Sequence, residues 1–207
     1  YKDSAGIGNF KYPVPDGALA LCSNNLSRVD NTKNSECILD PKKHFEVIQY
    51  SGNSTDNRFI NATSINDVTL KFKPDLLWIK RRTGGNMSWF VVDSSRSYSD
   101  GSGGNGNVGP LAFNENYVAS NTLTDGGFVG FENTGFKLGK GSGSGDAGYQ
   151  RNNASGGNYI AFMWKAGDSY STNNDGSIAA SVSANPAAGF SICNYTSTTG
   201  TVGHGLN

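Results

Sequence analysis

Three carboxylates are the residues of this sequence whose types could support hydrolysis of a glycan. A glycosidase needs two carboxyl groups that face each other across the sugar, and Asp93, Glu115 and Asp125 are available. Nothing in the sequence pairs any two of them. Arg96 follows Asp93 by three residues, which predicts an ion pair or turn contact at the end of a strand.

Residues 167–169 read GDS, which resembles the nucleophile segment of certain esterases. An esterase also needs a base beside its serine. The two histidines, His44 and His204, stand in unlike sequence contexts, so a turn after the strand that contains Trp164 is the better interpretation. We therefore predict that the chain is not an enzyme.

Cofactor and metal motifs also fail on their spacing. Residues 104–109 read GNGNVG, but Pro110 follows and no helix is predicted there to receive a phosphate. Residues 135–140 read GFKLGK, and Gly141 stands where a phosphate loop needs Ser or Thr. Neither histidine has Cys or carboxylate partners at ligand spacing, so we predict no cofactor and no transition-metal site. A calcium site on the oxygen-rich residues 168–175 is left open, although Gly176 does not fit a calcium loop.

Apolar residues alternate with others in many short segments, which predicts strands. In residues 159–165 the alternation places Ile160, Phe162 and Trp164 on one face, and Ala161, Met163 and Lys165 on the other. Glycine-rich stretches at 100–107, 125–127, 139–146 and 173–176 separate the segments and favour turns. The predicted fold is all-β, an antiparallel sandwich or jelly-roll with long Gly/Ser/Asn-rich loops. Its predicted strands are residues 45–51, 73–80, 89–93, 127–131, 136–138, 159–165, 177–183 and 190–196.

Composition agrees with a turn-rich β-protein that has an uncharged polar surface. Apolar residues make up 36% of the 207 residues and charged residues 16%, whereas there are 28 glycines. The 17 basic and 17 acidic residues balance and form no blocks, which argues against nucleic-acid binding and against membrane association. No apolar run is long enough to span a bilayer, so we predict no membrane insertion.

Cysteines and glycosylation motifs carry little weight. Cys22, Cys37 and Cys193 include no CxxC pair, which favours reduced thiols, and a disulfide between Cys22 and Cys37 stays open. Six Asn-X-Ser/Thr motifs follow from the high content of Asn, Ser and Thr. These motifs begin at Asn25, Asn53, Asn61, Asn86, Asn153 and Asn194.

One segment occurs twice. Residues 45–51 read FEVIQYS and residues 190–196 read FSICNYT, at an interval of 190 − 45 = 145 residues. The first copy continues to the apolar residues 73–80, and the second continues only to Asn207. We therefore expect residues 189–207 to begin a second unit, and the native product to extend beyond Asn207 or to be completed by another chain.

Several blocks resemble domains of tailed-phage virion proteins. Residues 9–17, NFKYPVPDG, and 19–26, LALCSNNL, resemble the closing segment of SPRY-like (concanavalin-type) domains. The following blocks resemble an uncharacterised β-rich repeat domain of marine and cyanobacterial tailed phages, found in tail-fibre-like proteins. They read HFEVIQYSG (44–52), KPDLLWIKRR (73–82), GFKLG (135–139), YIAFMWKAG (159–167), DGSI (175–178) and ANPAAGFSI (184–192). The chain departs from the family at residues 89–97, WFVVDSSRS, where a YDsvRG-like block is usual.

The resemblance implies three segments: the end of a SPRY-like domain and a linker (1–43), a β-sandwich repeat unit (44–188), and the start of a second, incomplete unit (189–207). It implies a virion structural protein on the particle surface, in a tail fibre or other appendage for attachment. Expected partners are other virion proteins, further copies of the chain, for which a trimer is common, and host cell-surface glycans. The alternatives are a capsid decoration or cement protein and a glycan-cleaving tail enzyme.

Aromatic side chains near loop ends are the candidate contacts to a glycan or partner, because their flat apolar faces can stack on sugar rings. For Trp89, ordinary packing is the preferred interpretation. The four candidates are Trp89, Tyr98, Tyr117 and Tyr149.

Overall fold

The chain divides into two compact units, residues 1–39 and 40–207, in a computed structural model. The structure describes residues 1–2, 11–15, 38, 40–61, 69–85, 87–96, 111, 113, 127–139, 147–196 and 199–206. Few residues of the first unit are among them, so the fold described below is that of the second.

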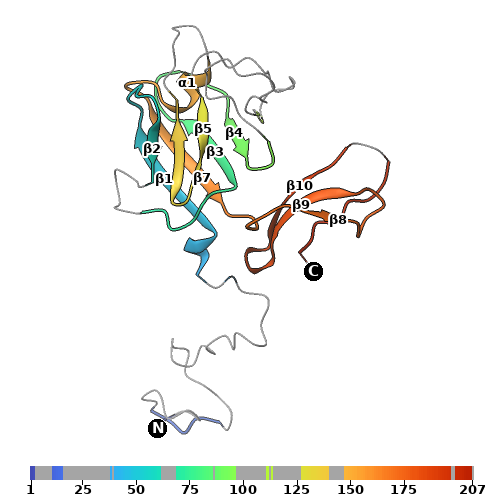
Figure 1. Cartoon of the computed structure of the whole chain (residues 1–207). Coiled ribbons are helices and arrows are strands. Elements are labelled where there is room, and N and C mark those ends of the chain that lie inside the picture. The colour runs from blue at the N-terminus through green and yellow to red at the C-terminus, as the bar shows by residue number, and fades with distance from the viewer. Residues whose placement is uncertain are drawn as a thin grey trace. The chain divides into compact units, whose positions relative to one another are not determined.

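Ten strands of the second unit form three antiparallel sheets among the described residues (Figure 1). The four-stranded sheet has the order β1 (Phe45–Ser51), β7 (Asn158–Trp164), β3 (Leu76–Arg81), β4 (Phe90–Asp93). One three-stranded sheet has the order β2 (Arg58–Ile60), β6 (Gly135–Leu138), β5 (Phe128–Glu132), and the other β10 (Phe190–Asn194), β9 (Ala180–Asn185), β8 (Ser171–Asn173). The helical elements are η1 (Pro41–Lys43), α1 (Ala147–Asn152) and η2 (Pro186–Ala188).

One apolar core lies between the four-stranded sheet and the β2–β6–β5 sheet. Its side chains come from β1 to β7 and from the segment before β3, and most of them are fully buried. Two sheets packed face to face over a shared core make a β-sandwich, which confirms the predicted fold class. The core residues are Ile48, Tyr50, Ile60, Leu70, Phe72, Leu77, Ile79, Phe90, Val92, Phe128, Phe136, Leu138, Tyr159, Ala161 and Met163.

Each predicted strand overlaps an observed one, with shifted ends, whereas the short strands β2 and β8 were not predicted. The strand predicted at residues 177–183 is observed as β9, which begins at Ala180 and runs on to Asn185, and Ile178 before it forms an isolated bridge with Val202. Helix α1 was not predicted, since six residues are too short to show a helical period. All four residues of β4 are buried, as expected for a continuous apolar run.

The central strand β7 has apolar residues on both faces, and only one face enters the core. Tyr159, Ala161 and Met163 are buried between the sheets. Phe162 and Trp164 point to the opposite side of the four-stranded sheet and are half-buried. Residues 168–169, which follow this strand, form the predicted bend.

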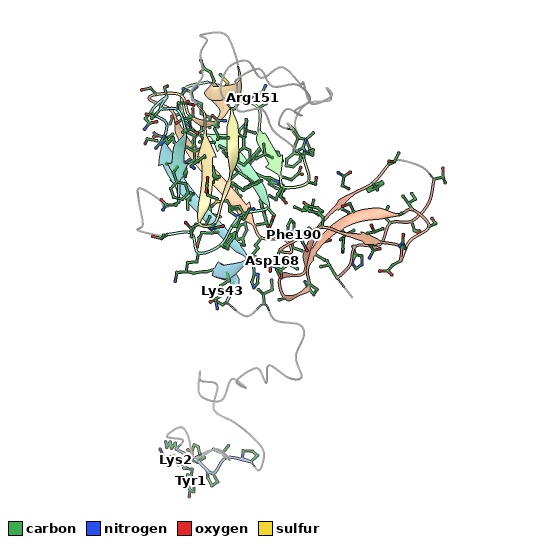
Figure 2. All side chains as sticks on the ribbon, viewed as in Figure 1. Tyr1, Lys2, Lys43, Arg151, Asp168 and Phe190 are labelled. Atoms are coloured by element: carbon green, nitrogen blue, oxygen red, sulfur yellow. The ribbon has the colours of Figure 1, made fainter. Side chains whose placement is uncertain are left out.

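Both copies of the repeated segment are strands, β1 and β10, and their first residues meet the same indole. The Phe45 ring centroid lies 5.0 Å from the Trp164 ring centroid. The Phe190 ring is stacked on the same indole, with 6.4 Å between the centroids. Phe190 is the first residue of β10 and is labelled in Figure 2. The expected boundary between residues 188 and 189 falls inside the hairpin of β9 and β10, where Phe190 pairs with Asn185.

Asn153 joins three segments of the sandwich from a fully buried position. Its Nδ2 donates to the carbonyl oxygens of Thr55 (3.0 Å) and Gly139 (3.2 Å). Its Oδ1 accepts a hydrogen bond of 2.9 Å from Nη1 of Arg58, and its side chain is 0% exposed. Because both ends of the amide are engaged and no surface is accessible, the Asn-X-Ser motif at this position is not a glycan acceptor in the folded protein.

We expect the substitution Asn153→Ala to lower the free energy of unfolding by about 2–4 kcal/mol, because it removes the partner of the buried Gly139 carbonyl, of the Thr55 carbonyl and of the Arg58 guanidinium. Urea unfolding followed by tryptophan fluorescence measures the change. Asn194→Ala, at an exposed position in β10, is the matched control. Equal stability of the two variants would contradict this account.

Candidate ligand-binding surface

Of the four residues predicted to contact a glycan or partner, the structure describes the side chain of one, Trp89. Trp89 is half-buried, and its ring packs against those of Trp78 (6.5 Å between centroids) and Phe162 (6.3 Å). These ring contacts are those of a packed residue, and whether Trp89 also contacts a ligand stays a prediction. Tyr98 and Tyr117 lie outside the described residues, and Tyr149 is described only as part of the backbone of α1.

Aromatic rings gather on the side of the four-stranded sheet that faces away from the core. Register brings them together, because Trp78 of β3 pairs with Phe162 of β7, and Trp164 pairs with Phe45 of β1. These side chains belong to one face because strand residues alternate between the two sides. We call the set the outer aromatic face: Phe45, Trp78, Trp89, Phe162, Trp164 and Phe190.

The rings of the outer aromatic face pack on one another at tilted or stacked angles. The Trp78 and Trp164 centroids are 4.6 Å apart, and those of Phe162 and Trp164 are 6.5 Å apart. Phe113, which is 55% exposed, adds an edge contact of 4.7 Å to Trp78. Mutual packing of this kind orients rings that would otherwise be free to rotate, and the part of their surface that is still accessible remains available for stacking.

Lys80 adds a positive charge beside these rings. Its Nζ lies 5.6 Å from the Trp89 ring centroid, in a cation–π contact, and donates a 2.5 Å hydrogen bond to the Met87 carbonyl. This pair of contacts holds the connection between β3 and β4 against the sheet.

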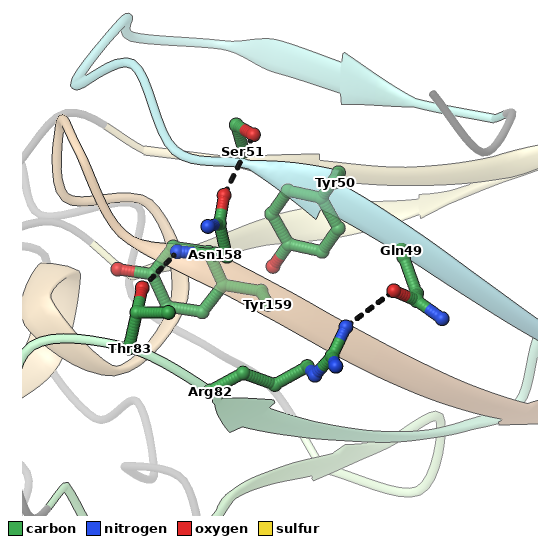
Figure 3. Close-up of a pocket in the computed structure, with 7 residues that line it drawn as sticks. All are labelled: Gln49, Tyr50, Ser51, Arg82, Thr83, Asn158 and Tyr159. Carbon is green, nitrogen blue, oxygen red and sulfur yellow. Dashed lines mark hydrogen bonds between the residues drawn. The ribbon is translucent and has the colours of Figure 1, made fainter. Parts of the chain in front are cut away.

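A small polar pocket lies where β1 and β3 end and β7 begins (Figure 3). Its volume is about 220 Å³. Asn158 is central: its backbone N–H donates to Oγ1 of Thr83 (3.0 Å), and its Oδ1 accepts from Oγ of Ser51 (2.8 Å). Arg82 donates from Nη1 to Oε1 of Gln49, as the dashed line in Figure 3 marks. The lining residues are Gln49, Tyr50, Ser51, Arg82, Thr83, Asn158 and Tyr159.

The pocket and the outer aromatic face occupy the same side of the sheet. Asn158, Phe162 and Trp164 are all even-numbered positions of β7, and the backbone N–H of Arg82 donates to the Asn158 carbonyl at 2.7 Å. Phe162 is four positions along the strand from Asn158, a rise of about 13 Å. The sheet therefore presents a polar, positively charged pocket at one end and a set of rings toward the other.

Trp89 is the one member of this surface that the sequence predicts as a contact. Trp78, Phe162, Trp164 and Arg82 are not predicted, because their proximity depends on strand register, which residues far apart in the sequence do not reveal. One signal was available: large rings at positions i and i+2 of a strand whose other face is already apolar.

Asp93 is engaged in the ion pair that its spacing predicts. Its Oδ2 lies 2.7 Å from Nε and 2.7 Å from Nη2 of Arg96, and its Oδ1 accepts from the Ser95 backbone N–H at 3.0 Å. Both side chains are mostly buried, so the pair is less accessible than a typical surface ion pair. The other two candidate carboxylates, Glu115 and Asp125, lie outside the described residues.

A second carboxylate, Asp75, connects β3 to two other segments. Its Oδ2 accepts a 2.9 Å hydrogen bond from the Ala166 backbone N–H, and its carbonyl oxygen accepts one of 2.7 Å from Ser94. Oγ of Ser94 lies 2.8 Å from the hydroxyl of Tyr170. Burial raises the pKa of Asp75, against the opposing effects of its hydrogen bonds with Ala166 and Ser94 and of the charges on Lys73 and Lys165. Burial also raises the pKa of Tyr170, and the charges of Asp93 and Asp75 add to that increase.

The remaining motifs make structural contacts. Nδ1 of His44 lies 3.0 Å from Nδ2 of Asn185, and Nδ1 of His204 accepts from the Leu206 backbone at 3.1 Å. Cys193 is a free, half-buried cysteine, whereas Cys22 and Cys37 lie outside the described residues. Residues 135–138 of the supposed phosphate loop are strand β6, and the motif at 104–109 falls in a part of the chain that is not described.

Within the described residues, no group of three or more His, Cys, Asp and Glu side chains lies close enough to hold a metal ion. No helix in that part of the chain has the length and apolar character needed to cross a membrane.

The raised pKa of Asp75 predicts a pH-dependent gain from Asp75→Asn. Between the unfolded and folded pKa values the native state binds more protons, so the contribution of Asp75 to stability falls as pH rises through that window. An amide keeps the acceptor for Ala166 and avoids the buried charge. We expect the Tm of the variant minus that of the original protein to be larger at pH 7 than at pH 4. Asp168→Asn makes the same change on an exposed side chain and is the control. A Tm difference that becomes smaller as pH rises would contradict the raised pKa of Asp75.

Comparison with known proteins yields one match. No curated protein and no solved structure matches the chain. Residues 40–207, the whole of the second compact unit, match the model of a domain of unknown function, DUF7483. The match covers well over half of the 207 residues, and the chain therefore belongs to the DUF7483 family.

Proposed function

We propose that this chain is a structural, non-enzymatic module of a virion surface appendage such as a phage tail fibre, and that it attaches the particle to its host by adhesion. The observation that carries the adhesive role is the outer aromatic face. Soluble domains rarely leave large rings clustered on a surface unless that surface binds something. Here the rings come from β1, β3, β7 and β10 and from the residue before β4.

The construction of the sheet supports a binding role for these rings. The face is built on paired strands, which hold side chains more rigidly than loops do. Its central strand β7 pairs along its full length with β1 and for six residues with β3. A preorganised set of rings loses little conformational entropy on binding, which favours affinity.

The placement in a virion is supported by the resemblance of the sequence blocks to tailed-phage proteins. Several of those blocks coincide with this surface, since residues 73–82 contribute Trp78 and Arg82, and residues 159–167 contribute Phe162 and Trp164. The segment that departs from the resemblance, residues 89–97, begins with the packed Trp89.

We expect Phe162→Ala to weaken adhesion by about threefold to tenfold, because it removes a stacking ring from the middle of the face. The purified protein is used to block adsorption of particles to host cells, and the concentration for half-maximal block is compared. Phe59→Ala is the matched control, because this ring is 43% exposed but belongs to β2 in the other sheet. Circular dichroism and thermal unfolding confirm that both variants fold. If both substitutions weaken the block equally, or if neither weakens it, the outer aromatic face does not carry the adhesion.

The location is tested by gold labelling of purified particles with an antibody to this chain, viewed by electron microscopy. We expect a small number of gold particles on the tail or its fibres. Dense label over the head would instead identify a capsid decoration protein, because such proteins occur in many copies per particle. Absence of label from every particle would contradict the virion assignment.

A further inference from the structure

The outer surface of the four-stranded sheet divides into two chemically different parts. Toward the end of β7 lie the rings of Phe162 and Trp164, and at its start lies the polar pocket around Asn158. A ligand that uses both parts must combine a flat apolar surface with hydrogen-bonding groups. It must also be long enough to span about 13 Å along the strand.

The pocket alone is too small for an entire ligand. Its 220 Å³ is below the roughly 300–1,000 Å³ of pockets that enclose a drug-sized molecule. The pocket therefore fits one group of an extended ligand, and the rest of that ligand continues over the neighbouring surface.

The chemistry of the lining favours an acidic group. The amide and hydroxyl side chains of Gln49, Asn158, Ser51 and Thr83 line the pocket together with Arg82, whose guanidinium contacts Gln49. None of the described lining residues is a carboxylate. Arg82 is exposed, and in the part of the chain that the structure describes its side chain makes one hydrogen bond, from Nη1 to Gln49. The guanidinium is planar, and its other N–H groups are arranged so that two of them can donate to two oxygens of one carboxylate or sulfate.

The second positive charge lies on the path between the two parts. Lys80 stands two residues before Arg82, and its register partner on β7 is Ile160, midway between Asn158 and Phe162. Its contacts with the Met87 carbonyl and the Trp89 ring hold the ammonium group beside the outer aromatic face. An anionic chain that enters the pocket would therefore meet favourable charge before it reaches the rings.

We infer that this surface binds an acidic polysaccharide, with the carboxylate or sulfate of one sugar in the pocket at Arg82 and the following sugars stacked on the rings around Phe162. A saccharide matches the lining because its hydroxyls can both donate and accept, as the amides and hydroxyls of the pocket require. Nucleic acid is disfavoured, since the net charge is zero and the pocket offers a single guanidinium. The inference rests on the proposed adhesive role and names its ligand.

Matched pairs of polymers test the inference by affinity electrophoresis of the full chain. Polygalacturonate is compared with its methyl ester, in which a methyl group replaces the charge of the carboxylate, and dextran sulfate with dextran. We expect at least one acidic polymer to retard the protein roughly tenfold more effectively than its neutral partner. The pair that shows the difference identifies the acidic group: the polygalacturonate pair tests a carboxylate, and the dextran pair tests a sulfate. Equal retardation by both members of each pair, or by none, overturns the inference.

Variants localise the binding. Arg82→Gln should reduce retardation by the acidic polymer about tenfold to a hundredfold, as expected for loss of a charge-assisted contact. Lys71→Gln removes one exposed positive charge before β3 and is the charge-matched control. Arg82 is exposed and its backbone hydrogen bond with Asn158 is retained, so the variant should fold. An equal loss in both variants overturns the assignment to the pocket.

Three results would refute this inference and leave the proposed adhesive role in place. The protein could bind neutral polymers in a way that is lost in Phe162→Ala but kept in Arg82→Gln. That result would support adhesion through the rings and would refute the inference that the ligand is acidic. Equal, Arg82-dependent retardation by polyglutamate would show that the pocket takes any carboxylate polymer, and would refute a saccharide-specific site. If no polysaccharide binds but the protein still blocks adsorption, the adhesive role stands and the saccharide inference fails.

Discussion

The two-residue period of β7 is the constraint on which the rest of the structure depends. This strand lies inside the four-stranded sheet and pairs with β1 on one side and β3 on the other. Its odd-numbered residues close the core against the β2–β6–β5 sheet, and its even-numbered residues build the outer surface. A shift of one residue in register would exchange the two sets. The core and the candidate binding surface are therefore two results of one pairing.

Much of the fold followed from alternation, and much of the surface did not. Residues 45–51 and 159–165 show the strand period in their own sequence, so the strands could be predicted locally. The choice of core face in β7 could not, because both faces are apolar. The face with the larger rings remained outside, and the face with Ala161 and Met163 was buried, together with Tyr159, whose hydroxyl donates to the Gln150 carbonyl at 2.9 Å.

The candidate surface required information that no single segment contains. Trp78 and Phe162 are 84 residues apart in the sequence (162 − 78), yet they are register partners. Arg82 reaches Asn158 only because β3 and β7 remain in register up to their ends. Sequence reasoning therefore placed its aromatic candidates on loops, where binding residues are most common, whereas the structure assembles its rings mainly on strands.

The rings of the outer aromatic face are also partly protected from water by one another. Trp164 lies in contact with Phe45, Trp78, Phe162 and Phe190, so each ring covers part of its neighbours. Such packing reduces the apolar area that is left in water and fixes the orientation of each ring. It also brings Phe190 of β10 against Trp164 of the four-stranded sheet.

The buried position of Asn153 has a consequence for biosynthesis. In a eukaryotic secretory pathway the Asn-X-Ser motif at residues 153–155 would be offered to the glycosylation machinery before the chain has folded. A glycan attached there has no space in a site that is 0% exposed, and the amide would lose its contacts to Thr55 and Gly139. Modified chains could not complete the sandwich. The choice of expression host therefore decides what fraction of the synthesised protein reaches the native state. A bacterial cytoplasm lacks that pathway, so Asn153 is not glycosylated there.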